Sequence, residues 1–314
     1  MLGCYAVTGG AGFIGSHIAL RLARDGHEVR VVDDLSTGSR ENLEGAGGKL
    51  RVIEGDICDG AALRQAFDGA DCVFHQAALA SVPRSVDDPA ATNRVNVDGT
   101  LHVLQAARDR GVRRVVYASS SSVYGDSPTL PKCEDMLPAP MSPYAVTKLA
   151  GEHYCAAFTE VFGLEAVSLR YFNIFGPRQD PHSQYSAVVP LFVTALLEGR
   201  RPTVFGDGEQ SRDFTYVENA VEANLRAARA PGAPGMAFNV GCGRCYTLNE
   251  LLQALGAILG CEAQADYAEP RAGDVRHSMA DIARARTVLG FEPLVGFEEG
   301  LRLTVEWYKG RAQA

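Results

Sequence analysis

The sequence predicts an α/β fold in which helices cover both faces of a doubly wound parallel sheet, followed by a smaller C-terminal α/β domain. Two observations carry this prediction. Short β-branched runs alternate with longer amphipathic stretches through the first half of the chain. After about residue 170 the alternation loosens, and glycine and proline cluster at 176–181, 199–208 and 231–235.

The individual elements follow from these patterns. Strands are expected at Tyr5–Val7, Glu28–Val32, Leu50–Ile53, Cys72–Phe74, Val112–Tyr117 and Ala166–Leu169. Helices are expected after the first strand, with apolar residues at Ile14, Ile18, Leu22 and Ala23, and at Ala61–Phe67, Val95–Arg110 and Ala145–Phe162. Residues 1–170 would form the main domain and residues 171–314 the smaller one. An apolar strand at 236–241 is a candidate to return to the main sheet.

The composition excludes several classes of protein. The 314 residues carry a formal net charge of −8, and 46% of them are hydrophobic. A nucleic-acid surface would need a basic stripe, which this acidic balance disfavours. No apolar run approaches the length of a membrane span, and the N-terminus has neither a basic segment nor a cleavage site of a secretory leader. A cytoplasmic protein is therefore expected.

The eight cysteines are scattered, and several lie inside apolar stretches, so they are expected to be reduced thiols. Cys242 and Cys245 form a C-x-x-C pattern. A zinc site would need a second ligand pair at regular spacing, and none follows. We interpret this segment as a glycine-containing loop after a strand and expect no metal site.

A glycine-rich segment joins the first strand to the first helix. Its glycines at Gly9, Gly12 and Gly15 suit a tight turn, a close approach of the backbone to a pyrophosphate, and close packing of the helix on the sheet. The free N–H groups of the helix N-terminus would then face the phosphates. This is the Rossmann-type pattern for binding a dinucleotide.

An acidic pair ends the second strand and indicates which dinucleotide. Asp33 stands where a carboxylate can accept hydrogen bonds from the adenosine ribose hydroxyls. Asp34 adds a second negative charge, and no arginine stands in the next few positions to meet a 2′-phosphate. The pattern therefore favours NAD over NADP. Asp56 and Ile57, after the third strand, are candidates to bracket the adenine.

Tyr144 and Lys148 form the candidate redox centre. Ser142 and Pro143 are typical of a helix start, and residues four apart share one face of a helix. A tyrosine is a poor base at neutral pH, since its free pKa is about 10. A nearby ammonium, the NAD⁺ charge and the helix N-terminus would all favour the phenolate. The ammonium could also hold the nicotinamide ribose.

Hydroxyl groups follow the fifth strand at 119–122, where ligands of open α/β sheets bind. Together with the glycine loop and the Tyr/Lys pair, this segment makes the chain similar to the extended short-chain dehydrogenase/reductase family over residues 1 to about 308. The motifs that carry the resemblance are T-G-G-A-G-F-I-G at 8–15, V-D-D-L-S-T-G at 32–38, H-Q-A-A at 75–78, N-V-D-G-T at 96–100, S-S-S-S-V-Y-G at 119–125 and P-Y-A-V-T-K at 143–148.

The resemblance implies a set of residues that contact NAD. Besides the three glycines, the acidic residues, Ile57 and the Tyr144/Lys148 pair, it comprises Phe13, Ile14, Ser36, Thr37, Gly38, Gln76, Ala77, Ala78, Asn96, Ser119 and Tyr171. The resemblance also implies a homodimer through the helices at 95–110 and 145–162, although the apolar residues of those helices could equally face the sheet.

The residues before Val123 separate the chemistries of this family. Sugar-nucleotide dehydratases carry an Asp-Glu pair there, and UDP-glucuronate decarboxylases carry a Glu. This chain has Ser121 and Ser122 instead, so elimination lacks its acid. The chain thus resembles the UDP-sugar 4-epimerases, in which a hydride is removed and returned. In that mechanism Tyr144 takes the proton of the sugar 4-hydroxyl, and Ser120 hydrogen-bonds the same oxygen, with Ser121 as a second donor.

The resemblance also assigns residues to the UDP-sugar. Arg212 and Arg271 would neutralise the diphosphate, Asp274 would accept from the uridine ribose, and Asn173 would contact the diphosphate-sugar region. The position of Ser278 carries a tyrosine in epimerases strict for UDP-galactose, so a small residue there leaves room for a 2-acetamido group. The remaining predicted contacts of the sugar are Ser81, Ser122, Ala187 and Val188.

Several alternatives remain open at this point. UDP-N-acetylhexosamines or dual specificity are favoured over plain UDP-hexoses alone, because the small residue at Ser278 leaves room for the acetamido group. Plain UDP-hexoses stay open as substrates, because room does not exclude the smaller sugar. UDP-glucuronate is a more distant substrate. A net oxidoreductase such as a 4-ketosugar reductase would release its cofactor. An NAD-sensing regulator on the same fold would usually lack the tyrosine or the lysine, and both are present here.

Overall fold

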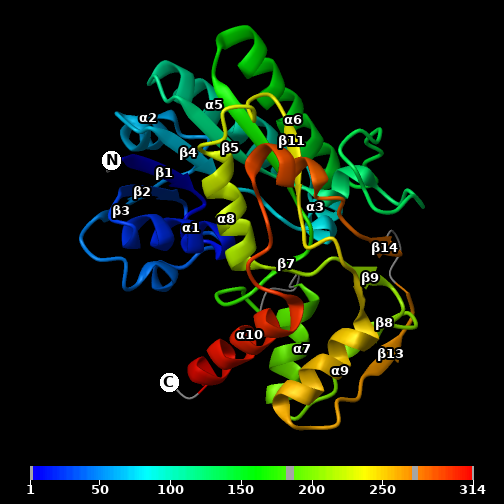
Figure 1. Ribbon diagram of the computed structural model, residues 1–314. Coiled ribbons are helices and arrows are strands. Elements are labelled where there is room, and N and C mark those ends of the chain that lie inside the picture. Colours follow the sequence, from blue (N-terminus) through cyan, green and yellow to red (C-terminus); the bar gives the residue numbers. More distant parts are fainter. Residues whose placement is uncertain (1–2, 182–186, 271–274, 313–314) are drawn as a thin grey trace.

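The computed structural model describes residues 3–181, 187–270 and 275–312. Its centre is a parallel sheet of seven described strands in the order β11-β6-β5-β4-β1-β2-β3 (Figure 1). The strands are β1 Cys4–Thr8, β2 Glu28–Asp33, β3 Leu50–Glu54, β4 Cys72–His75, β5 Arg114–Ser120, β6 Glu165–Tyr171 and β11 Ala237–Val240. The α/β doubly wound fold expected from the sequence is confirmed.

Helices cover both faces of this sheet, which explains its continuous apolar strands. Residues of α1 and α8 pack on one face in a core that includes Ile18 and Val221. Residues of α2, α5 and α6 pack on the other face in a core that includes Leu63, Val103 and Phe158. The bounds are α1 Phe13–Arg24, α2 Gly60–Phe67, α5 Gly99–Asp109, α6 Pro143–Phe162 and α8 Val217–Ala227.

Helix α6 carries the candidate redox pair, and its ends match the sequence signals. The Ser142 hydroxyl accepts a hydrogen bond from the Ala145 N–H, Pro143 occupies the first turn, and Gly163 ends the helix with a φ of 70°. The predicted helix at Val95–Arg110 instead begins as a π-helical turn, η2 (Arg94–Asp98), before α5. Two short helices, α3 (Val82–Asp87) and α4 (Pro89–Asn93), precede it.

Strand β11 lies at the edge of the main sheet, parallel to β6, with Phe238 opposite Leu169. The sequence from residue 171 onward thus contributes one strand to the sheet built mostly by residues before 170. The division of the chain into domains at residue 170 stays a prediction.

Most elements after β6, apart from α8, β11 and η4 (Ala285–Leu289), form a second layer beside the C-terminal edge of the sheet (Figure 1). Three helices share an apolar core there, and short strands pair across long stretches of sequence. The helices are α7 Val188–Leu197, α9 Leu248–Leu259 and α10 Phe297–Ala312. The strand pairings are β7 (Ile174–Phe175) with β10 (Thr215–Tyr216), β9 (Ser211–Arg212) with β12 (Tyr246–Thr247) and β14 (His277–Ser278), and β8 (Thr203–Phe205) with β13 (Asp266–Ala268).

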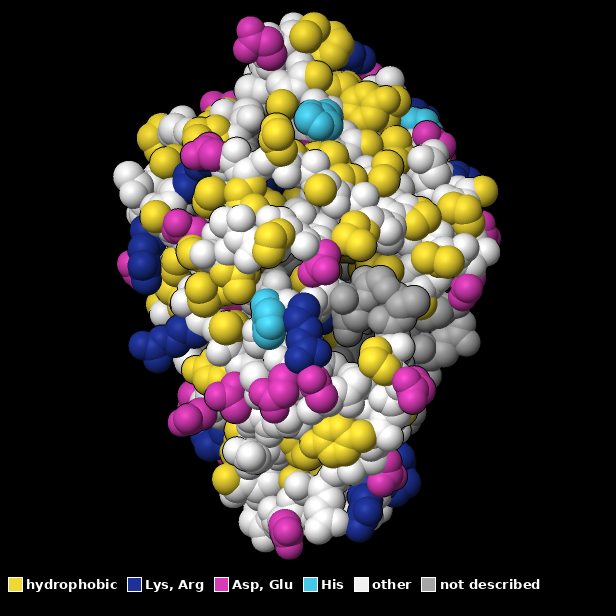
Figure 2. Space-filling model, turned by 90° about the vertical axis from the view of Figure 1, so that its right-hand side faces the viewer, with side chains coloured by type: hydrophobic (Ala, Val, Ile, Leu, Met, Phe, Trp, Pro, Cys, Tyr) yellow, Lys and Arg dark blue, Asp and Glu magenta, His cyan; other side chains and the backbone are white. Residues whose placement is uncertain are grey.

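Charges of both signs are spread over the surface. Figure 2 shows, on one face, acidic side chains gathered in a band below a region where hydrophobic and polar side chains alternate. On the described part of this face the basic side chains form no continuous stripe. Among the described residues, none of the helices is long and apolar enough to cross a membrane.

Candidate active site

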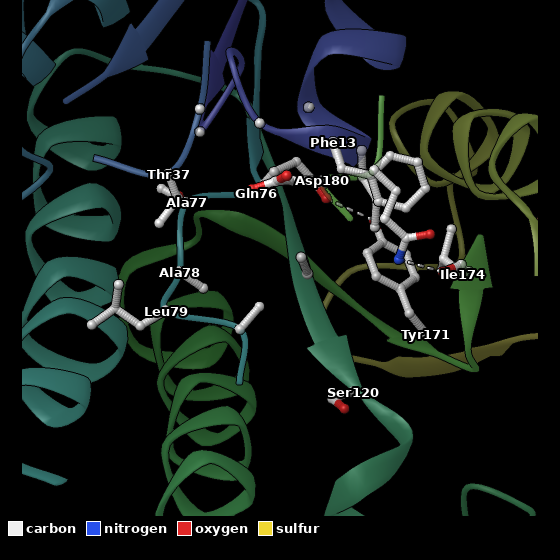
Figure 3. A pocket seen from close by; sticks show the side chains of 18 of the residues that line it. Phe13, Thr37, Gln76, Ala77, Ala78, Leu79, Ser120, Tyr171, Ile174 and Asp180 are labelled. Atoms are coloured by element: carbon white, nitrogen blue, oxygen red, sulfur yellow. Dashed lines mark hydrogen bonds between the residues drawn. The ribbon is translucent and has the colours of Figure 1, made fainter. Parts of the chain in front are cut away.

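A cavity of about 1350 Å³ follows the C-terminal edge of the parallel sheet, between the sheet and the second layer (Figure 3). Its walls come from the glycine loop and from the ends of β2, β4, β5 and β6, with β9 and β14 at one side. A cavity of this size has room for a dinucleotide and a second ligand beside it. This is also the position at which open α/β sheets bind nucleotides.

The glycine loop has the geometry of a diphosphate cradle. A Cβ on Gly15 would lie 2.1 Å from the Gly9 carbonyl oxygen, whereas a Cβ on Gly12 would meet only that oxygen, at 3.2 Å. Gly12 is the N-cap of α1, no side chain caps the helix, and its first turn has no acidic residue. The free N–H groups of α1 are therefore available to an anion at the cavity wall, and these residues fit an NAD diphosphate.

Asp33 lies at the end of β2 behind this loop. Its two carboxylate oxygens accept hydrogen bonds from the Ala11 N–H at 2.8 Å and the Leu35 N–H at 2.9 Å, and the residue is buried. Burial raises the pKa of this carboxyl above its usual value, and the two backbone hydrogen bonds act in the opposite direction. Asp34 is exposed and accepts from Ser36. Both acidic residues line the cavity, together with Ser36, Thr37 and Gly38.

The Gln76 side chain, just after β4, forms hydrogen bonds with Tyr171 and Asn224. The Tyr171 hydroxyl donates to the side-chain amide oxygen of Gln76 at 3.1 Å (Figure 3). The Asn224 amide accepts from the Gln76 amide N–H and donates to the Tyr171 hydroxyl. Gln76, Ala77, Ala78 and Tyr171 line the cavity. Asp56, beside Ile57 at the other end, forms an ion pair with Arg94 at 3.0 Å. Hydrogen bonds with Tyr171 and Asn224 therefore hold the Gln76 side chain in place at the cavity wall.

Tyr144 and Lys148 lie where β5 ends, as their helical spacing requires. The Lys148 ammonium donates to the Ala118 carbonyl at 2.7 Å and lies 5.9 Å from the centre of the Tyr144 ring. Ser119 and Ser120 follow Ala118 and line the same wall. The structure therefore brings together the side chains for which the resemblance implies proton transfer.

In this environment burial favours the neutral form of both groups. Burial raises the pKa of the Tyr144 hydroxyl, and a hydrogen bond with Ser120 acts in the opposite direction. Burial lowers the pKa of the Lys148 ammonium to about 7. A tyrosine base needs the phenolate, and a neighbouring ammonium stabilises that phenolate. Additional charges must therefore support the active protonation state.

The other end of the cavity carries the candidate substrate residues. Ser121, Ser122, Asn173, Arg212 and Ser278 all line it. The Ser122 hydroxyl is buried and has no hydrogen-bond partner among the described residues, which leaves it available to a bound molecule. Arg271 and Asp274 lie outside the described residues.

Four predicted contacts are not among the described residues that line the cavity, and they stay predictions. The Asn96 side-chain amide accepts a hydrogen bond from the Leu79 N–H and donates to the Leu79 carbonyl and the Thr147 hydroxyl. The Ser81 hydroxyl caps helix α3 by accepting from the Arg84 N–H. Ala187 is the exposed N-cap of α7, and Val188 packs into the apolar core of the second layer.

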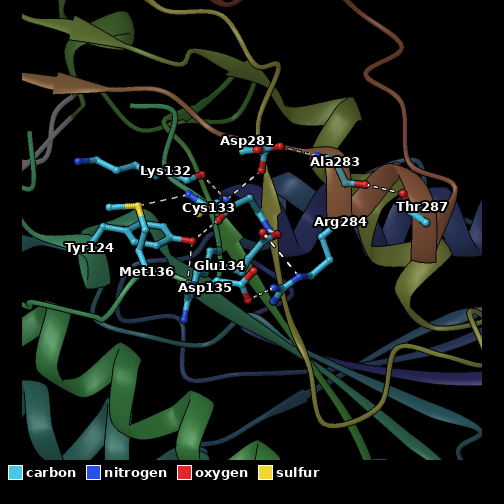
Figure 4. Close-up of polar contacts among 12 residues, drawn as sticks. Tyr124, Lys132, Cys133, Glu134, Asp135, Met136, Asp281, Ala283, Arg284 and Thr287 are labelled. Atoms are coloured by element: carbon cyan, nitrogen blue, oxygen red, sulfur yellow. Dashed lines mark hydrogen bonds and ion pairs between the residues drawn. The ribbon is translucent and has the colours of Figure 1, made fainter. Parts of the chain in front are cut away.

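Lys132 lines the cavity and was missed by sequence reasoning. Its side chain is buried, and its ammonium donates to the Ser127 carbonyl. The Lys132 backbone pairs with Met279 and Asp281, directly after Ser278, and Figure 4 shows this junction. The pairing spans about half the chain, so no local pattern could have indicated it. The one local signal for a cavity residue here was a lysine between the prolines at 131 and 138.

The segment from Cys242 to Cys245 is a loop held by a buried carboxylate. Asp213 accepts hydrogen bonds from the N–H groups of Cys242 at 2.8 Å and Gly243 at 2.9 Å. All eight cysteines are free, and burial raises the pKa of the Cys242 thiol to about 11. Within the described ranges no group of His, Cys, Asp and Glu side chains is arranged to hold a metal ion.

The buried His75 at the end of β4 should make the free energy of unfolding depend on pH. It is buried between the Thr8 and Thr100 hydroxyls, and burial lowers its pKa to about 3. Between pH about 6.5 and 3 the unfolded chain binds a proton at His75 that the folded chain does not. This histidine should therefore reduce the free energy of unfolding by up to about 1.4 kcal/mol per pH unit as the pH falls.

The measurement is urea unfolding of the wild type and His75→Asn between pH 7 and 4. The variant is expected to be less stable at pH 7, because it fills the site less well, but to lose less stability on acidification. Equal slopes for the two proteins would show that the histidine does not remain neutral in the fold.

Comparison with known proteins agrees with this geometry. A model described as "NAD dependent epimerase/dehydratase family" matches residues 5–241. The chain is 44% identical over 312 residues to the UDP-glucose 4-epimerase of Mycolicibacterium smegmatis, covering 98% of this chain and 99% of that protein.

Two solved structures are similar over nearly the whole chain. The UDP-N-acetylglucosamine 4-epimerase of Methanobrevibacter ruminantium, in complex with UDP-N-acetylmuramic acid, is 42% identical with a TM-score of 0.94, and the match covers 99% of both chains. The UDP-glucose 4-epimerase of Thermotoga maritima, with UDP-glucose, is 40% identical with a TM-score of 0.94, covering 98% of this chain and 99% of that one.

Proposed function

The chain belongs to the NAD dependent epimerase/dehydratase family, and on that basis we propose that it inverts C4 of a UDP-hexose, with UDP-N-acetylglucosamine and UDP-N-acetylgalactosamine as preferred pair. One observation carries the proposal. Tyr144, Lys148 and Ser120 meet at one wall of a cavity in which Ser121 and Ser122 stand where dehydratases of the family carry carboxylates. The wall offers a proton acceptor and hydroxyl donors.

The chain's own residues divide the work of the reaction. The Tyr144 phenolate takes the proton of the 4-hydroxyl, Ser120 hydrogen-bonds the same oxygen, and Lys148 stabilises the phenolate. NAD held by the glycine loop and the acidic pair would supply the redox chemistry, as acceptor and donor of the hydrogen at C4. The cavity would let the 4-keto sugar turn, and Tyr144 would then return the proton to its oxygen with C4 inverted.

The NAD-binding residues proposed are those of the glycine loop, the acidic pair after β2 and the wall at Gln76–Ala78, all of which line the cavity. Arg212 is proposed to bind the substrate diphosphate, because a guanidinium is charged at every working pH and matches phosphate geometry. Asn173 would contact the adjoining part of the sugar nucleotide. Arg271 and Asp274 keep the roles that the family resemblance implies.

Ser278 is proposed to set which sugars fit. It lies on β14 at the cavity wall and leaves 8% of its surface exposed. Ser278→Tyr should lower kcat/KM for the two N-acetylated substrates by roughly 10–100-fold, since the ring would fill the space of the acetamido group. The plain hexoses should change by much less. Equal losses for all four sugars would remove Ser278 from the selectivity of the enzyme.

The proposal is tested by comparing kcat/KM for the four UDP-hexoses and UDP-glucuronate, with purified protein and no added cofactor. We expect turnover of the N-acetylated pair, with slower or equal turnover of UDP-glucose and UDP-galactose. Turnover of UDP-glucuronate alone would replace the proposed substrate with a uronate. Failure of all five to react without NAD(P)H would contradict an epimerase.

We also propose a homodimer in the cytoplasm. Three large apolar side chains of α6, Val146, Val161 and Phe162, are about half exposed or more, which supports a partner surface on this helix. A second copy of the chain is the occupant that the family resemblance implies. Light scattering after size exclusion should give twice the mass of 33.6 kDa. A mass of one chain at micromolar concentration would contradict the dimer.

A further inference from the structure

Helix α6 presents a third polar side chain below the Tyr/Lys pair. Glu152 follows Lys148 by four residues, as Lys148 follows Tyr144, so the three side chains share one helix face. Glu152 is 7% exposed and therefore buried. Carboxylates are rarely buried unless they are paired, so this one requires an explanation.

Two strands of the main sheet hold this carboxylate. Arg170 on β6 donates to both of its oxygens, from Nε at 2.9 Å and from Nη2 at 2.7 Å. The Ser119 hydroxyl on β5 donates to one of them. Ser119 and Arg170 are paired opposite each other in the sheet, and Lys148 is bonded to Ala118, the neighbour of Ser119. The carboxylate is thus fixed beside the strand end that positions the lysine.

Arg170 is itself fixed from the far side. Its Nη1 donates to the Tyr124 hydroxyl at 2.8 Å, and this hydroxyl donates to Asn239 at 2.7 Å. Asn239 in turn binds the carbonyls of Lys132 and Asp281, part of the junction shown in Figure 4. The Arg170 guanidinium, paired with both oxygens at 2.9 and 2.7 Å, is thus the charge partner of the buried Glu152 carboxylate.

Burial holds three other titratable groups that face Lys148 in their neutral forms, whereas Arg170 on β6 is charged and paired with Glu152. Burial lowers the pKa of His75 on β4 to about 3 and raises that of Cys155 on α6 to about 12. Burial also raises the pKa of Tyr117 on β5 well above its usual value. Of the described carboxylates, Glu152 is the one whose charge raises the pKa of the Lys148 ammonium, against the effect of burial.

We propose that Glu152, held by Ser119 and Arg170, is a positioning residue that keeps Lys148 in its ammonium form in the NAD-bound enzyme. The need for it follows from the environment, since burial and the charge of the cofactor both disfavour the ammonium. Without that ammonium the Tyr144 phenolate loses a stabilising neighbour. The expected effect on kcat rests on the proposed function, whereas the effect on the phenolate titration does not.

The test compares Glu152→Gln with Glu152→Asp in the NAD-bound protein. Glu152→Gln should move the alkaline limb of kcat to lower pH by roughly one to two units, because the lysine then loses its proton earlier. Glu152→Asp keeps the charge and should keep the limb near its original position. Tyr124→Phe is the matched control, since it removes a hydrogen bond of Arg170 and leaves both charges in place.

A second readout does not require turnover. The phenolate absorbance of Tyr144, obtained as the difference between each protein and its Tyr144→Phe counterpart, should titrate at higher pH in Glu152→Gln. If that single variant does not fold, Glu152→Gln with Arg170→Gln removes both charges together and leaves neither buried alone. The shift should keep its direction but be smaller in this double variant, because the loss of the Arg170 charge acts on the lysine in the opposite sense and Glu152 shares the helix face of Lys148.

Different results would contradict the proposed function and the proposed role of Glu152. A wild-type protein that inverts no sugar would contradict the proposed function, and the phenolate titration would still test Glu152. An alkaline limb and a phenolate titration that match the wild type in Glu152→Gln would overturn the inference, even if kcat fell at every pH.

Discussion

Tyr144→Phe is expected to lower kcat by about 10²–10⁴-fold, the usual contribution of a positioned acid or base. The phenylalanine keeps the ring that lines the cavity and removes only the hydroxyl that exchanges a proton with the sugar. The affinity for the UDP-sugar should change little, because Arg212 and the rest of the substrate wall are unaffected. The measurement is kcat from initial rates with the preferred N-acetylated substrate.

Two controls separate lost chemistry from lost structure. Calorimetry with UDP should give nearly the wild-type Kd, and the amount of NAD that copurifies should be unchanged. A variant with near-normal kcat would remove Tyr144 from the mechanism. A variant that lost both NAD and UDP would show that the hydroxyl is structural.

Gly15→Ala should abolish NAD binding and destabilise the fold. The new methyl would lie 2.1 Å from the Gly9 carbonyl oxygen and 2.9 Å from the Gly10 Cα, and both are backbone atoms of the loop. Helix α1 must then move away from the loop. Overpacking of this kind costs about 1–3 kcal/mol, occasionally more. Thermal unfolding and the NAD content of the purified protein measure the two effects.

Gly12→Ala is the matched comparison within the same loop. Its methyl would meet only the Gly9 oxygen, at 3.2 Å, so the fold should lose little stability. The methyl would stand where the backbone approaches the diphosphate, and NAD affinity should fall. Gly48→Ala, with nothing within 4 Å, should change neither property. Normal NAD content in Gly15→Ala would contradict the assignment of the loop.

Much of the main sheet could be predicted because its signals are local. The apolar run Cys72–Phe74 predicts strand β4, whose residues are all buried. Ser142 and Pro143 predict the start of helix α6. The two-residue strands β9, β12 and β14 could not be predicted. Each exists only through pairing with a segment tens of residues away, and two residues have no periodicity.

In the candidate site, too, the residues with a local sequence signal could be predicted and those that depend on distant contacts could not. Motif residues at the ends of the strands line the cavity, because the carboxyl ends of parallel strands share one edge of the sheet. Asn96 lies on a π-helical turn that aims its amide at Leu79 and Thr147, which a regular helix from Val95 did not predict. Glu152 carried a local signal, its spacing from Lys148, but its significance required knowing that Arg170 lies beside it.

The central claim is that the hydrogen removed from C4 returns to the same carbon. It is tested most directly with UDP-N-acetylglucosamine deuterated at C4, incubated with the purified protein and no added cofactor. The account predicts UDP-N-acetylgalactosamine that retains the deuterium at C4, with none exchanged to solvent. Loss of the label, or product formation only with stoichiometric NAD(P)H, would contradict it.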